Sequence, residues 1–237
     1  MIKHVSFDLW YTIIKSNPRF GAKRDFGFFQ ILKSISNDVS LEHIQKGYKK
    51  IKKMADPLGE STGVGLTKKQ LYFLFLEQLF GEKTHLILRD NTDLIDRLDG
   101  EYEKLFMKYP PLLIDKNALS NVLTILKSKN ITTNILSNTT FANGNLLFKV
   151  LQHYKLSTYF DSFIFSDEVG YFKPNPNIFL SAYYNELFYL NVSNKNEVLH
   201  VGDNSYADYK GASDFGFTPF LFSPSTPNYQ EILTHIK

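Results

Sequence analysis

The chain contains no cysteine, which excludes disulfide bonds, a thiol nucleophile and thiolate metal ligands. No apolar run approaches the roughly 20 residues that a membrane-spanning helix needs, and no signal peptide is visible, so we expect a cytoplasmic protein without a membrane partner. The net charge of +3 is too small to predict nucleic-acid binding. What the 237 residues do supply is 43% hydrophobic and 15% aromatic side chains, enough for one large domain or a core with an insertion.

The first informative segment is VSFDLWYT, residues 5–12. A short strand-prone run ends there in the carboxylate of Asp8, and the hydroxyl of Thr12 follows four residues later. In an open parallel sheet, ligands bind outside the carboxyl ends of the strands. A carboxylate at such an end is held on a rigid strand and faces the solvent-filled mouth. Asp8 can therefore act as a nucleophile or as a metal ligand.

Two later segments supply polar groups in comparable positions. Ser137 and Asn138 end another β-prone run, where a hydroxyl, an amide and backbone N–H groups suit a phosphate or carboxylate oxygen. Lys173 precedes a stiff turn of two prolines. Its cation would neutralise the negative charge that a carboxylate and an anionic substrate bring together.

The last segment is HVGDNSYADYKGA, residues 200–212. A buried-type strand delivers Asp203 directly after a glycine, and Asp208 lies five residues further on at the start of a predicted helix. Together with Asp8 these carboxylates form the hard oxygen-ligand site that Mg²⁺ prefers. The histidines are scattered without ligand spacing, so we expect no zinc site.

In their order and separation, the four segments resemble the four signature motifs of the haloacid dehalogenase (HAD) superfamily of hydrolases. The resemblance extends over the whole chain. It implies that Asp8 is the nucleophile and that Lys173 takes part in catalysis. It also implies that Ser137 and Lys173 bind the substrate or its phosphate. From their places in the segments, we expect Asn138 to bind there too, and Thr12 and Asp208 to take supporting positions.

The resemblance also implies a Mg²⁺ cofactor, because phosphatase members bind it through the first Asp, the carbonyl two residues later and an acidic residue of the last motif. These positions are Asp8, Trp10 and Asp203 here. Phosphatases usually carry a second Asp where this chain has Trp10; that Asp protonates the leaving group and later activates water. Loss of a general acid or base typically lowers the rate by ~10²–10⁴. Tyr11 replaces a glycine, so we expect the turn after Asp8 to be built differently.

Three functions remain open. The dehalogenase branch of the family also has an aromatic residue in place of the second Asp, so Trp10 favours a metal-free 2-haloacid dehalogenase acting through an Asp8 ester. Asp203 and the five-residue gap to Asp208 favour the metal-binding form, because an extra carboxylate would repel a carboxylate substrate. The third reading is a catalytically idle member that binds a ligand or partner. We predict a Mg²⁺-dependent phosphatase for a small anionic, phosphorylated substrate; the oligomeric state stays open.

The spacing of the motifs predicts the domain organisation. More than a hundred residues separate the first motif from the second, whereas one βα unit needs only ~30. We therefore predict a Rossmann-like parallel sheet core, residues 1–13 and 109–237, with an all-helical cap inserted at residues 14–108. Helical patterns in the insertion fall near 26–36, 41–53, 67–79 and 91–109, with a glycine-containing loop at 57–65.

From residue 115 onward, helical and strand patterns alternate. Helices are predicted near 117–129, 143–153, 175–189 and 206–215, and strands near 131–136, 162–166, 197–202 and 219–222. Within the cap, the basic run at residues 46–53 is predicted to be a solvated helix face. Arg19, Lys23 and Arg24 enter the cap close to Asp8 and are candidates for contact with an anionic substrate.

Overall fold

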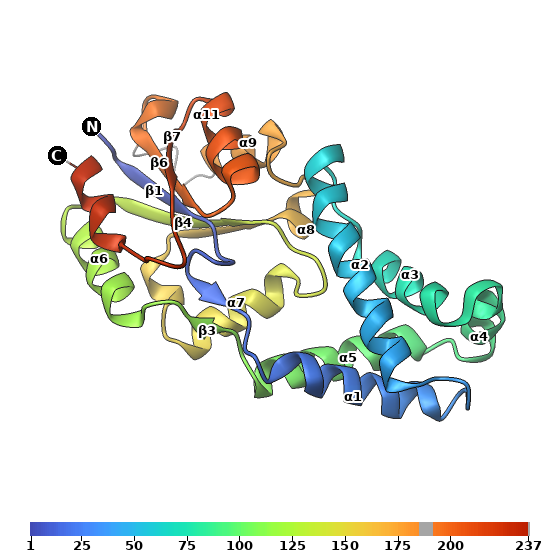
Figure 1. Cartoon of the computed structure of the whole chain (residues 1–237). Coiled ribbons are helices and arrows are strands. Elements are labelled where there is room, and N and C mark those ends of the chain that lie inside the picture. Colours follow the sequence, from blue (N-terminus) through green and yellow to red (C-terminus); the bar gives the residue numbers. More distant parts are fainter. Residues whose placement is uncertain (185–191, 237) are drawn as a thin grey trace.

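The computed structural model of the chain describes residues 1–184 and 192–236 (Figure 1). Within these residues, five parallel strands form one sheet in the order β5-β4-β1-β6-β7. Their bounds are β1 (His4–Phe7), β4 (Thr132–Ser137), β5 (Ser162–Phe165), β6 (Val198–Gly202) and β7 (Thr218–Leu221). Phe7, at the end of the central strand β1, is in register with Ile135 of β4 and Val201 of β6. The polar segments that follow these strands therefore meet at one edge of the sheet.

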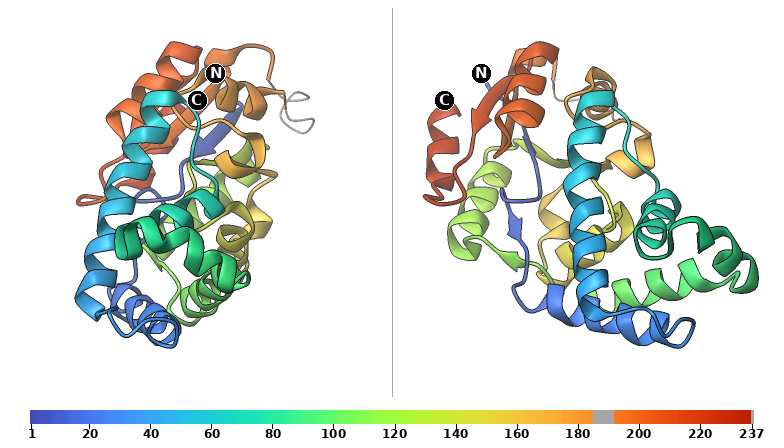
Figure 2. Two further views of the ribbon diagram at one scale, coloured as in Figure 1. Left: turned by 90° about the vertical axis from the view of Figure 1, so that its right-hand side faces the viewer. Right: turned by 45° about the vertical axis from the view of Figure 1, so that its right-hand side comes forward.

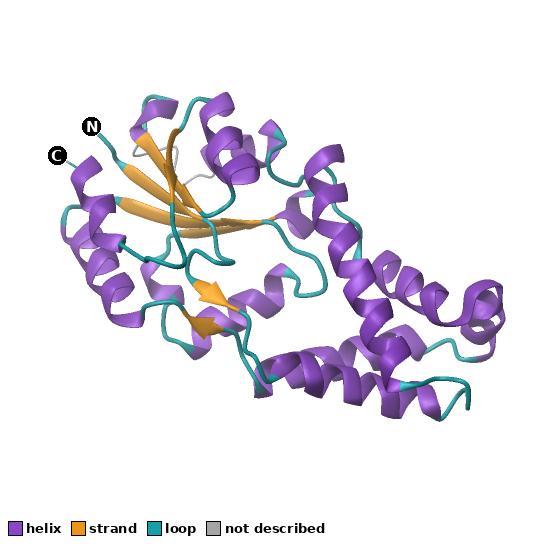
Figure 3. Ribbon diagram, viewed as in Figure 1, coloured by secondary structure: helices purple, strands orange, loops and turns teal. Residues whose placement is uncertain are grey.

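Helices cover both faces of this sheet (Figure 3). Successive side chains of a strand point to opposite faces, and Ile135 and Leu136 accordingly belong to different hydrophobic clusters. The first cluster includes α6 (Lys116–Ser128), α7 (Gly144–His153) and the 3₁₀ helix η5 (Tyr229–His235); the second includes α9 (Pro176–Tyr183) and α11 (Gly211–Phe215). The predicted Rossmann-like α/β core is confirmed.

The segment between the first and second motifs is helical. Two short antiparallel strands, β2 (Ile14–Lys15) and β3 (Leu112–Leu113), enclose it. Its helices are α1 (Phe20–Lys33), α2 (Leu41–Thr62), α3 (Lys68–Phe80), η1 (Gly81–Lys83), α4 (Thr84–Asp90) and α5 (Leu94–Lys108). In the views of Figure 2 these helices lie to one side of the sheet, with α1 packed on α5 and α2 on α3. The assignment of residues 14–108 to a separate cap domain stays a prediction.

Helix α2 differs from the sequence prediction, which placed a loop at residues 57–65. The helix begins at its cap Ser40 and continues through Pro57 to a left-handed Gly63 with φ 74°. Tertiary packing explains the extension: the ring of Phe172 lies so close to Gly59 that a Cβ there would be 2.8 Å from it. Contacts of this kind override the helix-breaking preference of proline and glycine.

The other predicted elements are observed to within a few residues, with three differences. The helix predicted at 26–36 begins earlier, at Phe20. The helix predicted at 206–215 consists of a π-helical turn, η4 (Ser205–Lys210), followed by α11. The helix predicted at 175–189 is observed as α9, and residues 185–191 lie outside the described part of the chain. No helix in the described part is both long enough and apolar enough to cross a membrane.

Candidate active site

A buried ion cluster joins three of the four motifs. Asp8 directly follows β1, and its N–H donates to the carbonyl of Val201 at 2.8 Å, which fixes its backbone on the sheet. The ammonium of Lys173 donates to Asp8 Oδ1 at 2.7 Å, to Asp208 Oδ1 at 2.6 Å and to the carbonyl of Leu136 at 2.7 Å. Because Lys173 is only 1% exposed, these three acceptors satisfy all three of its protons.

Asn138 holds Lys173 in place. Its side-chain oxygen accepts from the Lys173 N–H at 2.7 Å, and its Nδ2 donates to the Lys173 carbonyl at 3.1 Å. Asn138 lines the cavity described below, but its side-chain amide is already hydrogen-bonded to the backbone of Lys173. Ser137 is fully buried, outside the residues that line the cavity, and its hydroxyl donates to the Asn138 carbonyl at 3.3 Å. Substrate binding by Ser137 and Asn138 stays a prediction.

Asp208 is fixed by the turn that follows β6. Its Oδ2 accepts from the N–H of Asn204 at 3.0 Å, and its Oδ1 lies 3.1 Å from His200 Nε2. The other ring nitrogen of His200 lies 3.1 Å from Ser6 Oγ, so this histidine is a hydrogen-bonded core residue. Gly202 is required here because a Cβ would overlap the Asp208 carboxylate.

Burial and neighbouring charges shift the pKa values of these groups in different directions. Burial raises the pKa of Asp8 to about 7; Lys173 opposes this shift and Asp208 adds to it. Burial and Asp208 raise the pKa of Asp203 to about 6. Burial alone would raise the pKa of Asp208, but Lys173 and His200 hold it below its usual range. Burial would lower the pKa of Lys173, but the carboxylates of Asp208 and Asp8 hold it above its usual value.

The carboxylates fit a divalent cation. One oxygen from each of Asp8, Asp203 and Asp208 can be chosen so that all three lie within 4.8 Å of one another. Lys173 supplies a single positive charge to this group, and the raised pKa values of Asp8 and Asp203 reflect burial together with carboxylate repulsion that remains. A donor set of hard carboxylate oxygens matches the preference of Mg²⁺.

The turn after Asp8 contains a residue in the left-handed backbone conformation, although the glycine usual at this position is replaced by Tyr11. Tyr11 adopts φ 55°, and its N–H donates to the Ile14 carbonyl at 2.7 Å. A non-glycine residue in this region costs roughly 1–2 kcal/mol. The indole of Trp10 packs edge-to-face on Phe106, with ring centroids 6.4 Å apart. Thr12 is buried and its Oγ1 has no hydrogen-bond partner among the described residues, so its supporting role stays a prediction.

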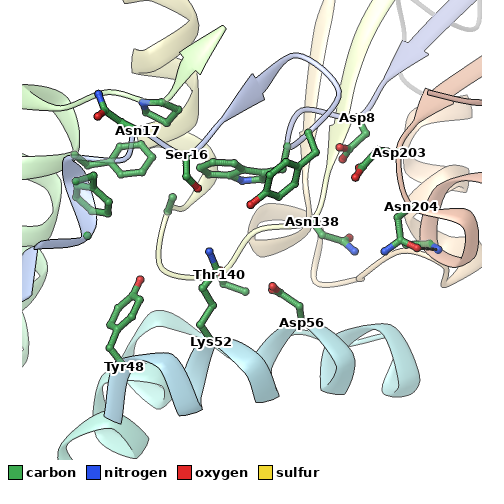
Figure 4. Close-up of a pocket in the computed structure, with 18 of the residues that line it drawn as sticks. Asp8, Ser16, Asn17, Tyr48, Lys52, Asp56, Asn138, Thr140, Asp203 and Asn204 are labelled. Carbon is green, nitrogen blue, oxygen red and sulfur yellow. Dashed lines mark hydrogen bonds between the residues drawn. The ribbon is translucent and has the colours of Figure 1, made fainter. Parts of the chain in front are cut away.

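A cavity of about 560 Å³ adjoins the ion cluster and is lined by residues of both the sheet core and the helical segment. Tyr48, Lys52, Asp56 and Glu60 lie at successive four-residue intervals on α2 and all line the cavity, so they form one stripe. Figure 4 shows the first three of them. The lysines of the basic run are exposed, in line with the predicted solvated face, but the sequence analysis missed this stripe and the place of Lys52 on the cavity wall. The four-residue spacing was visible, but it does not reveal which partner a helix faces.

The stripe also connects α2 to the last motif. Glu60 Oε1 accepts from Asn204 Nδ2 at 2.8 Å. Burial raises the pKa of Glu60, and Asn204 opposes the shift. Burial also raises the pKa of Asp56, while Lys52 opposes that shift. Titratable groups from the helical segment therefore share the cavity with the ion cluster.

Of the three basic candidates, Arg24 lines the cavity, whereas Arg19 and Lys23 are exposed and lie outside its wall. The Arg24 guanidinium binds Asp25 Oδ1 through two nitrogens, at 2.9 and 2.5 Å. It also stacks over the ring of Tyr48, 3.3 Å from the ring centroid. Its contacts within the protein hold it against the cavity wall.

The fold and this cluster define a hydrolase of the HAD type, and the comparisons with known proteins agree. A family model described as haloacid dehalogenase-like hydrolase matches residues 2–216, so the chain belongs to this family. The comparison with curated proteins found no match.

Solved structures of the family share the fold. The magnesium-bound HAD-hydrolase YfnB from Bacillus subtilis is 17% identical with a TM-score of 0.63, and the alignment covers 99% of this chain and 98% of that one. The HAD phosphatase from Thermococcus onnurineus is 20% identical, with a TM-score of 0.65 and the same coverage of 99% and 98%. The 2-haloacid dehalogenase from Pseudomonas syringae pv. Tomato DC3000 is 18% identical, with a TM-score of 0.60 and coverage of 96% and 89%.

Proposed function

We propose that this hydrolase is a Mg²⁺-dependent phosphatase that acts on a small phosphate monoester through a covalent Asp8 intermediate. The observation that carries the proposal is the placement of Asp203. Its carboxylate lines the cavity beside Asp8 and belongs to the group of three acidic residues that fits a cation. A metal-free enzyme for a carboxylate substrate would gain nothing from a second carboxylate in this position.

In the first step, an oxygen of Asp8 attacks phosphorus, and the bond between phosphorus and the ester oxygen breaks. The leaving group departs with the electron pair. Lys173 holds Asp8 Oδ1 and thereby leaves the second carboxylate oxygen available for attack. In the second step, water attacks the aspartyl-phosphate, which releases inorganic phosphate and regenerates Asp8.

Asp8, Asp203 and the carbonyl of Trp10 would hold Mg²⁺, with Asp208 close by. Bound there, Mg²⁺ supplies electrostatic stabilisation to the charge that develops on the phosphoryl oxygens. Asn138 would contribute to catalysis by fixing the backbone of Lys173. Lys173 would contribute by neutralising the carboxylates of Asp8 and Asp208.

A 2-haloacid dehalogenase is the second candidate, and the side chain of Trp10 favours it. An indole neither donates a proton to a leaving group nor activates water, and a departing halide needs no proton. In this case Asp8 would attack the carbon that carries the halogen. Water would then hydrolyse the resulting ester.

One pair of assays separates the two candidates. Release of phosphate from p-nitrophenyl phosphate and release of chloride from 2-chloropropionate should each be measured with Mg²⁺ and with a chelator. We expect Mg²⁺-dependent phosphate release that disappears in Asp8→Asn and persists in Asp38→Asn, which removes the same charge at an exposed position. Chelator-resistant chloride release would establish the dehalogenase instead, and absence of both reactions would contradict both candidates for these substrates.

A further inference from the structure

The cavity next to Asp8 is lined by aromatic rings from three parts of the chain. Trp10 and Tyr11 come from the turn after β1, Phe20 from the start of α1, and Phe106 from α5. Tyr109, directly after α5, extends the same lining. These rings share the cavity with Asp8, so they face whatever group is attached to a phosphate bound there.

Packing fixes the orientation of these rings. The ring centroid of Phe20 lies 5.2 Å from that of Phe106 at an interplanar angle of 89°, and 5.2 Å from that of Tyr102 at 88°. Trp10 meets Phe106 at 69°. Such edge-to-face pairs are the favoured arrangement of aromatic rings. A further ring entering the cavity would meet a preorganised aromatic wall.

The backbone of Tyr11 gives an independent indication that an aromatic ring is needed in the cavity. It holds a left-handed backbone conformation that glycine would adopt without strain, and its side chain is 45% exposed. An exposed ring on a strained backbone adds little to the stability of the fold. Strain of this kind is typical of functional sites, and this ring lines the cavity.

No acidic side chain stands at position 10 to protonate the leaving group, because the residue there is Trp10. Lys173 is saturated by three acceptors, and Arg24 is bound to Asp25 and stacked on Tyr48. On the opposite wall, α2 presents Lys52 and Asp56 (Figure 4). A leaving group that needs no proton removes the requirement for an acid.

From the aromatic wall and the indole at position 10, we propose that the substrates are phosphate monoesters of phenols. This proposal rests on the proposed phosphatase function. A phenol is as acidic as a tyrosine side chain, with a pKa of about 10, whereas an alkoxide is about as basic as hydroxide, whose conjugate acid water has a pKa of about 15.7. A phenolate therefore leaves with the electron pair of the broken P–O bond without being protonated.

Three substrates separate ring recognition from leaving-group chemistry. Phenyl phosphate has a ring and a good leaving group, benzyl phosphate has a ring and an alkoxide leaving group, and n-hexyl phosphate has only the alkoxide. We expect the kcat/KM of phenyl phosphate to be at least ~10²-fold above that of benzyl phosphate, the effect of a missing general acid. The KM of benzyl phosphate should be several-fold below that of hexyl phosphate.

Equal kcat/KM for phenyl and benzyl phosphate would overturn the proposal, because another group, with Asp56 as the first candidate, would then be supplying the proton. A KM for hexyl phosphate at or below that of benzyl phosphate would overturn it as well. Asp56→Asn identifies the donor in the first case, since it would then slow benzyl phosphate and spare phenyl phosphate.

Variants of the wall give a second test. Tyr11→Gly removes a ring and relieves the backbone, so it should fold and should raise the KM for phenyl phosphate by about two- to tenfold, the effect of one aromatic contact. Phe26→Leu is the matched control, because Phe26 is exposed on α1 and lies outside the cavity wall. Equal KM values in wild type and Tyr11→Gly would contradict the role of this ring.

Binding can be measured without turnover. Trp10 is the single tryptophan of the sequence and lines the cavity, so its fluorescence reports occupancy directly. Phenylphosphonate, which is not hydrolysed, should bind several-fold more tightly than hexylphosphonate in the presence of Mg²⁺. Tight binding of phenylphosphonate with no hydrolysis of any phosphate would refute the phosphatase function and keep the aromatic preference; equal binding of both phosphonates would refute the preference itself.

Discussion

Replacing Lys173 by methionine tests whether the ion cluster is organised as the structure indicates. Methionine keeps most of the volume of the lysine side chain but removes its charge and its three donors. Asp8 Oδ1, Asp208 Oδ1 and the Leu136 carbonyl would each lose a hydrogen bond of 2.6–2.7 Å. The side chains of Asp8 and Asp208, which are 8% and 3% exposed, would then lie together in the interior without a cation.

Removing one partner of a buried ion pair typically costs about 3–5 kcal/mol of unfolding free energy. For a chain of this size each kcal/mol lowers the Tm by about 2–4 °C. We therefore expect Lys173→Met to lower the Tm by about 6–20 °C, measured with a chelator present so that no metal compensates for the lost charge. Activity should be lost as well, since Asp8 would be neither neutralised nor oriented.

Two companion variants should change the stability in the opposite direction, because each removes a carboxylate. Asp8→Asn removes one of the repelling carboxylates, so it should be at least as stable as the wild type under the same conditions. Lys173→Met combined with Asp208→Asn should recover a substantial part of the stability lost in Lys173→Met alone. Urea unfolding followed by circular dichroism measures all four proteins. A loss below about 1 kcal/mol in Lys173→Met, or a larger loss in Asp8→Asn than in Lys173→Met, would refute the account.

Three further outcomes are expected. Mg²⁺ at about a hundred times its Kd should raise the unfolding free energy of the wild type by about 2.7 kcal/mol, and Asp203→Asn should abolish most of this gain; an unchanged melting curve on Mg²⁺ addition to the wild type would contradict the metal site. Burial lowers the pKa of His4 to about 3, so its contribution to stability is complete above pH 6.5 and is lost as the pH falls toward 3. Between pH 7.5 and 5.5 the unfolding free energy of the wild type should therefore fall by about 1.4 kcal/mol more than that of His4→Gln. Equal losses of both proteins in urea titrations would show that His4 is not the cause. Asn138→Ala should lower kcat more than it raises KM, because it frees the Lys173 peptide rather than removing a substrate contact; a selective rise in KM would instead indicate direct substrate binding by Asn138.

The sequence was sufficient for the class of fold and for the candidate catalytic carboxylates. Strand-prone runs that end in Asp8, Ser137 and Asp203 carry their information locally, in β-branched and aromatic residues followed by a turn. Parallel pairing of β1 with β4 and β6 then makes the ends of these strands coincide. The order of the motifs was enough to predict that these residues lie at one edge of the sheet.

The course of α2 could not be derived in the same way. Pro57 and Gly59 predict a loop by their intrinsic preferences, and the helix continues because Phe172, distant in the sequence, packs against the position where Gly59 has no side chain. The direction of the stripe from Tyr48 to Glu60 depends on how α2 is held against the core. The sequence pattern of a basic helix face is the same whether that face lies against water or lines a cavity.

The sequence by itself determined which chemical groups are available: a carboxylate on the first strand, a lysine in a stiff turn, and an indole where a second acid usually stands. Tertiary structure alone decided what each group contacts. It engaged the amide of Asn138 with the backbone of Lys173, brought Glu60 to Asn204, and placed aromatic rings of α1 and α5 on the wall of the cavity that Asp8 also lines. The reason is physical: the motif pattern is set by local backbone preferences and register, whereas hydrogen-bond partners and cavity walls depend on contacts between residues far apart in the sequence, such as Glu60 and Asn204.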